Sequence, residues 1–167
     1  MTAERIDLLI AAPKTLAHLV VEASDAQLDQ EPTGAGWTVR TVLAHVRDFE
    51  FLEARLALER ALAEDGPSVS ALDNRVWERD RNRTRDRKEW LLADFALQRQ
   101  ASASILRALR EPDWQRQLQT PFAGRLTISS LLDWWLEHDA LHVAQLEDAI
   151  GETLAEVLAR RARMRDA

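Results

Sequence analysis

The chain has 167 residues, of which 46% are hydrophobic and 30% charged, with a formal net charge of −6 at pH 7 and no cysteine. This balance is typical of one globular domain rather than a disordered chain. The absence of cysteine excludes disulfides, thiolate metal sites and cysteine nucleophiles. The negative charge disfavours a nucleic-acid partner; without a signal peptide or a membrane-length apolar run, we expect a cytoplasmic protein with no membrane partner.

The first predicted helix runs from Ala3 to Ala23, where apolar residues recur at the spacing of one helical face. Pro13 should kink this helix or mark where its regular part begins. A loop is expected from 29 to 37, because that stretch is rich in residues that favour turns. The turn formers are Pro32, Gly34 and Gly36.

The second predicted helix is long; Thr38 can cap its start, and it ends before Gly66. Residues 68–87 are polar and are predicted to be irregular. The run RVWERDRNRTRDRK at 75–88 holds seven basic and three acidic residues, an excess of four. A solvated linker is the simplest interpretation, and a site for an anionic ligand or an RNA contact is the alternative.

A third helix is predicted from Asp86, which can form a capping box with Glu89, to about Arg110. A loop or short hairpin is expected from 113 to 126, where Pro121 and Gly124 are turn formers.

The fourth predicted helix has Thr127 at its start and Gly151 at its end, which are favoured cap residues at those positions. The tail, 152–167, is rich in arginine and is predicted to form a short fifth helix. Its anchors are Leu154, Val157 and Leu158.

These segments predict an all-α fold, with one four-helix bundle over residues 1–151 followed by the tail at 152–167. The connections between the helices are about ten residues or longer, so the order and handedness of the bundle stay open.

Three of the four histidines are predicted to face the inside of this bundle. His138 and His142 lie one turn apart on one face of the fourth helix, about 6 Å from each other, so both can reach a single ion. His45 lies at the margin of the apolar stripe of the second helix. Neighbouring bundle helices, about 8–10 Å apart, can therefore bring three imidazoles around one divalent ion and leave open coordination positions. The alternative is that each imidazole satisfies a backbone carbonyl at the edge of the core.

Other histidine motifs fit less well. The string HDALH differs from the zinc-protease pattern because Asp139 replaces the glutamate and no third ligand follows at the expected place. A di-iron site would need further carboxylates at defined spacing, which the sequence does not provide. His18 is interpreted as an ordinary residue at the edge of the core.

The segments GWTVRTVLAHVRDFE, LDNRVW, FALQRQASASILRAL and LTISSLLDWWLEHDALHVAQL resemble the DinB family of metal-binding four-helix bundles over most of the chain. In that family one histidine on the second helix and a pair on the fourth hold a metal, which matches His45, His138 and His142. The resemblance implies a divalent ion, usually nickel, zinc or iron, and frequent homodimers. Characterised relatives include transferases and isomerases that use a low-molecular-weight thiol as co-substrate.

A metal-bound histidine usually donates its other ring proton to a carboxylate or carbonyl, and nearby candidates are Asp48, Asp139 and Glu137. Asp48 is preferred, because it lies about 60° from His45 on the helical wheel, whereas Glu50 lies about 140° away and is interpreted as a surface or inter-helix charge. Further pocket candidates are Asp73 and Trp77, with Arg55 and Arg99 as sites for an anionic substrate.

The sequence therefore favours a metal-dependent thiol transferase or hydrolase that acts on a small molecule, since an open three-histidine site can activate either a thiol or water. One alternative is a non-catalytic stress-response bundle with a structural or regulatory ion, and another is a metal-free interaction bundle. The sequence identifies neither the native metal nor the substrate.

Overall fold

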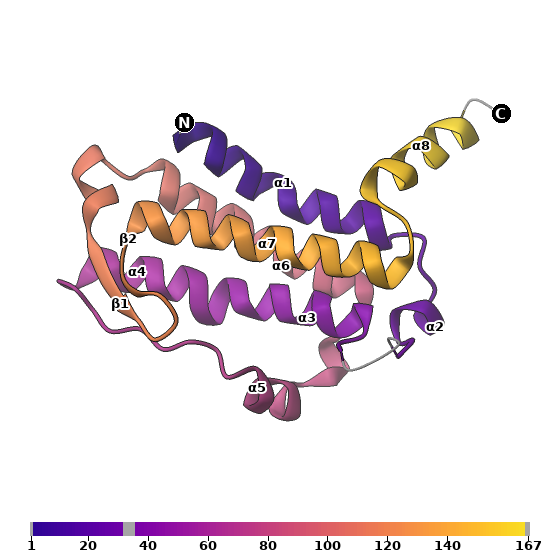
Figure 1. Cartoon of the computed structure of the whole chain (residues 1–167), viewed down its shortest axis with the longest axis horizontal. Helices are drawn as coiled ribbons and strands as arrows, with labels where there is room; N and C mark the ends of the chain where they lie inside the picture. The colour runs from indigo at the N-terminus through magenta and orange to yellow at the C-terminus, as the bar shows by residue number, and fades with distance from the viewer. Residues whose placement is uncertain (1, 32–35, 166–167) are drawn as a thin grey trace.

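Four long helical segments lie side by side in the computed structural model, which describes residues 2–31 and 36–165 (Figure 1). They confirm the predicted all-α four-helix bundle. The second segment is continuous but contains one π-helical stretch, η1, between two α-helices. The segments are α1 (Thr2–Val20), α3 (Val39–Phe49) with η1 (Glu50–Arg55) and α4 (Leu56–Ala63), α6 (Lys88–Arg107), and α7 (Ile128–Ile150).

Shorter elements connect and extend these helices. In Figure 1 the hairpin of β1 and β2 lies at one end of the bundle, α2 and α8 lie at the other, and α5 lies along the outside of α3. None of the helices in the described residues is long and apolar enough to cross a membrane. The short elements are α2 (Asp25–Leu28), α5 (Asn74–Asp80), η2 (Arg83–Arg85), η3 (Glu111–Gln115), β1 (Gln117–Thr120), β2 (Gly124–Thr127) and α8 (Leu154–Arg165).

The packing resolves the order of the helices, which the sequence left open. α1 packs against α6 and α7, and α3 packs against the same two helices, so α1 and α3 are diagonal to each other. Consecutive long helices are therefore diagonal at the first and third connections and adjacent at the second. α3 and α7 run antiparallel, because His45 lies beside His142 while Phe49, one turn later, lies beside Trp134.

The caps that were predicted for the second and fourth helices are present. The Thr38 side chain accepts a hydrogen bond from the Thr41 backbone N–H, and that of Thr127 accepts one from Ser130. α7 ends at Gly151, whose φ of 77° is a left-handed conformation that glycine adopts without steric cost. The short hairpin is also confirmed, with β1 and β2 antiparallel and Gln117 opposite Thr127.

Two predictions about the connections were wrong or incomplete, and a third is only partly testable. Residues 68–87 are not wholly irregular, because α5 forms behind an Asp73 side chain that accepts two backbone N–H groups. Asp86 does not cap α6; its buried carboxylate pairs with Arg81 and, at 3.7 Å, with Arg47. Pro32 and Gly34 of the expected 29–37 loop lie outside the described residues.

The tail forms the expected helix, α8, but only part of the predicted anchoring holds. Val157 is buried and Leu154 packs against the core, whereas Leu158 is 41% exposed. Ion pairs supply the rest of the anchoring of α8, because Arg160 and Arg161 both pair with Glu22, just beyond the end of α1.

Two apolar clusters fill the bundle, and a layer of buried polar groups lies between them. The cluster nearer the hairpin contains Leu9 and Trp135, and the other contains Leu16 and Leu146. Along α7, His138, Asp139 and His142 lie between Trp135 of one cluster and Leu146 of the other; along α6, Arg99 lies between Phe95 and Ala103. The polar layer therefore crosses the bundle near its middle.

Candidate metal centre

Three imidazole nitrogens converge inside the bundle. The Nε2 atom of His138 lies 3.1 Å from Nε2 of His45 and 3.1 Å from Nε2 of His142. His45 comes from α3 and the other two from consecutive turns of α7, as expected from their spacing. His45 and His142 are buried and His138 is partly buried. The three side chains form the one such group of potential metal ligands found among the described residues.

Aromatic rings surround these imidazoles. Phe49, one turn after His45, stacks on the His138 ring with centroids 3.6 Å apart. Trp37 lies 4.7 Å from the His45 ring, and Trp77 of α5 lies 5.3 Å from the same ring. This apolar cover lowers the local dielectric, which strengthens any electrostatic interaction inside the site.

The surroundings keep the histidines neutral. Burial lowers the pKa of His45 to about 3, and burial, with a contribution from neighbouring His142, lowers the pKa of His138 to about 2. The pKa of His142 is also lowered, again chiefly by burial. Each ring therefore keeps one nitrogen lone pair at neutral pH, which is the form that binds a metal.

The arrangement fits a metal ion better than it fits hydrogen bonds among the rings. A neutral imidazole nitrogen carries either one proton or one lone pair, so His138 Nε2 cannot make two good hydrogen bonds to the two nitrogens that face it. Three lone pairs directed at one point would instead repel one another in an apolar site. A cation bound by all three removes this conflict, and imidazole nitrogens suit zinc, nickel, iron and copper.

Gln145 is a site residue that the sequence analysis missed. Its Oε1 lies 2.9 Å from Nδ1 of His142 and accepts a hydrogen bond from the Nδ1–H group, which leaves the Nε2 lone pair directed at the site. The sequence contained the signal for this contact, because Gln145 follows His142 by three residues and residues three apart on a helix are neighbours. The Nδ1 atoms of His45 and His138 are buried and have no hydrogen-bond partner in the part of the chain that the structure describes.

The carboxylates that were expected to orient the histidines serve other partners. Asp48 accepts hydrogen bonds from Arg47 and from the Trp77 indole N–H, at 2.7 and 2.9 Å, rather than from His45. The helical wheel placed Asp48 on the correct side of α3 but could not reveal that Trp77 reaches it from α5. Asp73 caps α5, where its side chain accepts the backbone N–H groups of Arg75 and Val76.

Asp139 belongs to a buried ionic network instead. It accepts from the Arg99 guanidinium at 2.9 Å, and Glu50 accepts from Nε of the same arginine at 2.9 Å. Glu50 is fully buried, so it is an inter-helix charge and not a surface one. Arg99 is 1% exposed, which corrects the expectation that it could bind an anionic substrate. Burial raises the pKa of Glu50, while the nearby Arg99 opposes that rise.

The remaining sequence candidates lie away from the three imidazoles. His18 is partly exposed and contacts Arg161 of α8 through Nδ1, in agreement with an edge-of-core role. Glu137 is exposed on α7. Arg55 borders a separate cavity, which it shares with Asp48, Asp73 and Trp77.

Comparison with known proteins agrees with this geometry. A model described as the DinB superfamily matches residues 8–146, which include all three converging histidines. The chain belongs to the DinB superfamily. The resemblance carried by the histidine-containing segments is therefore confirmed for most of the chain.

Individual DinB relatives cover most of the chain at low identity. A protein of Oceanobacillus iheyensis named "Putative metal-dependent hydrolase" is 27% identical over 145 residues, spanning 80% of this chain and 77% of that protein. YfiT of Bacillus subtilis, which has the same kind of name, is 26% identical and spans 86% of this chain and 80% of its own length.

A solved structure supports the fold. The YfiT structure superimposes with a TM-score of 0.77 over 91% of this chain and 89% of YfiT, at 22% identity. That structure is described as a four-helix bundle of unusual topology.

Proposed function

We propose that this protein is a metal-dependent hydrolase of a small molecule, with His45, His138 and His142 as ligands of a divalent ion. The observation that carries the proposal is the convergence of three neutral Nε2 atoms, with 3.1 Å from His138 to each of the others. The names of the DinB relatives, which describe metal-dependent hydrolases, support the same class. Three protein ligands leave positions open for a substrate, as in catalytic rather than structural sites.

The chain's own residues have separable roles in this proposal. Gln145 fixes the ring of His142 and directs its lone pair. Phe49 and Trp37 pack against the imidazoles and keep the site dry. When bound, a divalent ion would act as a Lewis acid and lower the pKa of water or a thiol that reaches it.

Thiol transfer is the second candidate, and one observation favours it. The two acidic residues nearest the histidines in sequence on the buried side, Asp48 and Asp139, are both held by arginines. Neither is free to take a proton from a nucleophile. A thiol, with an ordinary pKa of about 8.5, needs less help to ionise than water does. A low-molecular-weight thiol is therefore proposed as the alternative co-substrate.

We also propose the identity of the ion, the location, the assembly and the partners of the protein. They are nickel, zinc or iron as the ion, a cytoplasmic location, a homodimer, a small-molecule substrate, and no nucleic-acid or membrane partner. Light scattering on the purified protein tests the homodimer. The non-catalytic alternative, a stress-response bundle with a structural or regulatory ion, differs from the enzyme in what metal removal does.

Metal analysis of protein expressed without added nickel tests the ligand set. The wild type should hold about one divalent ion per chain, whereas His138→Ala should lose most of it, because removing one of three ligands sharply weakens binding. His18→Ala is the matched control and should keep the ion, since His18 lies at the α8 contact. A wild type that holds no metal and cannot be refilled with nickel or zinc contradicts the proposal.

Melting curves and activity assays then separate the two classes. In the enzyme, chelation should abolish turnover of esters, amides or thiol acceptors while the fold survives at assay temperature. In the structural alternative, chelation should unfold the bundle and no turnover should be found with the metal bound. Parallel assays with and without added thiol distinguish transfer from hydrolysis.

A further inference from the structure

A cavity of about 710 Å³ lies beside the histidine site but is not lined by any of the three histidines. It is formed between the α3–η1 helix and the segment that carries α5 and η2, with Gln98 of α6 also bordering it. Its volume lies in the range of cavities that hold small organic ligands. Trp77 belongs to both places, since it lines the cavity and covers His45.

The wall of the cavity includes large apolar side chains that the fold leaves open to solvent. Phe51 and Leu52 of η1 are 53% and 44% exposed, and Val76 of α5, across the cavity, is 44% exposed. Leu72 and Trp77 continue the wall and are more buried. An apolar ligand group placed here would remove this surface from water, which is favourable in proportion to the area covered.

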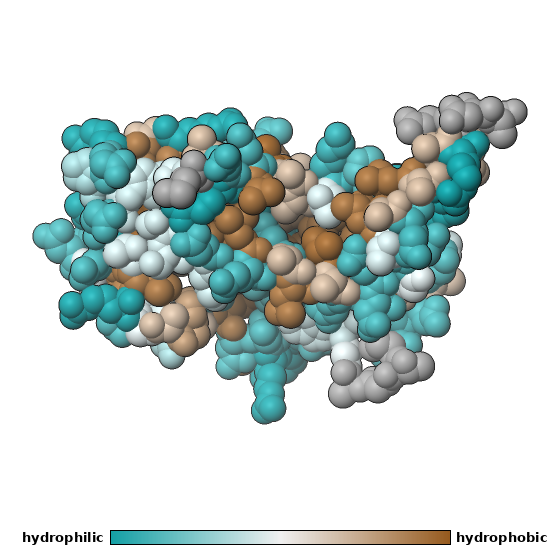
Figure 2. All heavy atoms as spheres, turned by 45° about the horizontal axis from the view of Figure 1, so that its top comes forward, coloured by the Kyte–Doolittle hydropathy of each residue, from teal (hydrophilic) through white to brown (hydrophobic). Residues whose placement is uncertain are grey.

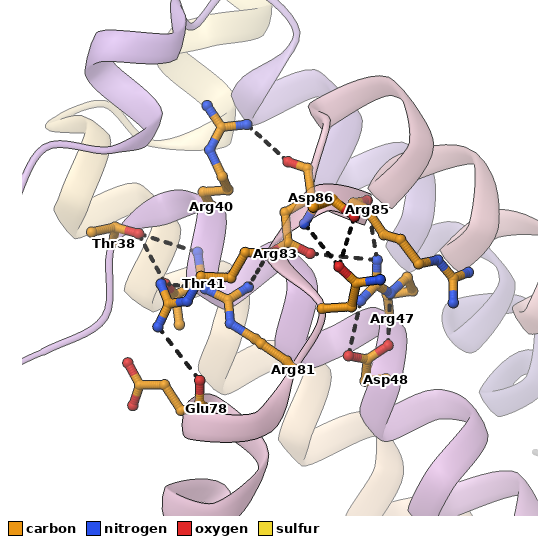
Figure 3. Close-up of polar contacts among 12 residues, drawn as sticks. Thr38, Arg40, Thr41, Arg47, Asp48, Glu78, Arg81, Arg83, Arg85 and Asp86 are labelled. Carbon is orange, nitrogen blue, oxygen red and sulfur yellow. Dashed lines mark hydrogen bonds and ion pairs between the residues drawn. The ribbon is translucent and has the colours of Figure 1, made fainter.

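Two of the four arginines that border the cavity are already engaged. Arg47 pairs with Asp48 at 2.7 Å, and Arg81 pairs with the buried Asp86, so both hold η2 and α5 against α3 (Figure 3). Their exposure is low, and their charges are matched by neighbouring carboxylates. We assign these two arginines to the structure of the cavity wall.

The other two arginines pair more loosely with carboxylates. Arg55 has 15% of its side chain exposed and borders the cavity; it lies 3.6 Å from Glu59, and its guanidinium stacks over the Phe51 ring at 4.8 Å. Arg85 lies 3.5 Å from Asp94, with 64% of its side chain exposed. In Figure 3 the Arg85 side chain extends away from the Arg47–Asp86 group, and its backbone carbonyl accepts a hydrogen bond from Arg47. Such long contacts to exposed carboxylates contribute little, so a better anion can replace them.

The acidic residues that border the cavity do not cancel the attraction of these two arginines for an anion. Asp48 is held by Arg47 and the Trp77 indole, and Asp80 pairs with Arg79 at 2.6 Å. Asp73 accepts the backbone N–H groups of Arg75 and Val76. Each carboxylate thus has donors of its own, whereas Arg55 and Arg85 form looser ion pairs, at 3.6 and 3.5 Å, with exposed carboxylates.

We propose that this cavity binds a small organic anion with an aromatic or aliphatic body. Arg55 and Arg85 would hold its carboxylate, sulfonate or phosphate group, and the wall of Phe51, Leu52 and Val76 would cover its apolar part. The binding does not depend on a metal at the histidine site, so it goes beyond the proposed function and can be tested separately from it.

Two fluorescent probes with one aromatic framework test this proposal. Anilinonaphthalene sulfonate carries an anionic group, and N-phenylnaphthylamine is its uncharged counterpart. We expect the sulfonate to bind at least about tenfold more tightly, and Arg55→Gln or Arg85→Gln to weaken it about tenfold without affecting the neutral probe, as for the loss of one charge-assisted hydrogen bond.

Arg107→Gln is the matched control, because Arg107 is an exposed arginine of α6 outside the cavity and pairs with Asp7. It should bind both probes as the wild type does. Circular dichroism and melting curves establish that each variant is folded, and Arg85 is exposed enough for its substitution to leave the core intact. Equal affinity for the two probes, or sulfonate binding that neither arginine variant weakens, would overturn the proposal.

Discussion

Gln145 shows how much a single side chain contributes to the geometry of the metal centre. Its amide oxygen fixes one ring nitrogen of His142 at 2.9 Å and so selects which nitrogen faces the site. His45 and His138 have no comparable partner among the described residues. Phe49 and the tryptophan rings hold those two imidazoles by contact alone, so His142 is the proposed ligand with the best-defined orientation.

Gln145→Leu should therefore weaken metal binding about 10- to 100-fold, the usual effect of losing a group that orients a ligand. Titration calorimetry with zinc or nickel in the presence of a competing chelator measures it. Glu137→Gln on the same helix is the control, because Glu137 is exposed and away from the imidazoles. Equal affinities for both variants would show that packing, and not Gln145, orients His142.

The neutral histidines also predict a pH dependence for the metal-free protein. Their pKa values lie below the ordinary 6.5, with His45 at about 3, because burial penalises the charged form. Between these values the unfolded chain binds more protons than the folded one, so stability is fully present above about pH 6.5 and is lost as the pH falls. Each such histidine should lower the free energy of unfolding by up to about 1.4 kcal/mol per pH unit.

Urea unfolding of the metal-free protein at pH 7.5, 6.5 and 5.5 measures this loss. His45→Gln should flatten the pH dependence, because the variant lacks one of the groups that the unfolded chain protonates. A wild-type stability that is constant over this range would contradict the buried, neutral state of the imidazoles.

At the scale of elements, the buried network around Arg99 joins the long helices. From α6, Arg99 reaches Glu50 of η1, Asp139 of α7 and the backbone carbonyl of Leu9 in α1. Glu50 also accepts from the Trp135 indole at 3.0 Å. Because Asp139 is adjacent to His138, and Glu50 follows Phe49, the network holds both elements that carry the proposed metal centre. The π-helical turn begins at Glu50, and such turns recur at functional sites.

Arg99→Met should destabilise the protein by about 3–5 kcal/mol, because it leaves two carboxylates buried without their cation. Thermal or urea unfolding measures the change. Arg107→Met is the control and should cost less than about 1 kcal/mol, since its pair with Asp7 is exposed.

A triple variant separates lost charge balance from lost packing. Adding Glu50→Gln and Asp139→Asn to Arg99→Met removes the uncompensated charges, so much of the stability should return. If Arg99→Met is no less stable than Arg107→Met, the network does not hold the helices together as inferred.

Contacts between elements also explain why the α5 segment was misinterpreted as a linker. Its polar, charge-rich sequence is typical of a solvated linker. The structure instead buries Arg81 and Asp86 as a pair against α3 and places Trp77 over His45. Arg81 and Asp86 are five residues apart, and Trp77 contacts a helix more than 30 residues earlier in the chain. Contacts at these separations produce no periodic pattern in the sequence. Local sequence rules therefore could not find this element.

At the scale of the whole molecule, the amino-acid sequence by itself determined the four helices, their caps at Thr38, Thr127 and Gly151, and the inward direction of the three histidines. Helical periodicity and cap chemistry depend on residues a few positions apart, so they can be read without a fold. Tertiary structure alone decided which helices are diagonal, and with it the partners of Asp48, Asp139 and Glu50. Those partners come from other helices, and the choice among several nearby arginines and rings depends on distances that only the packed bundle defines.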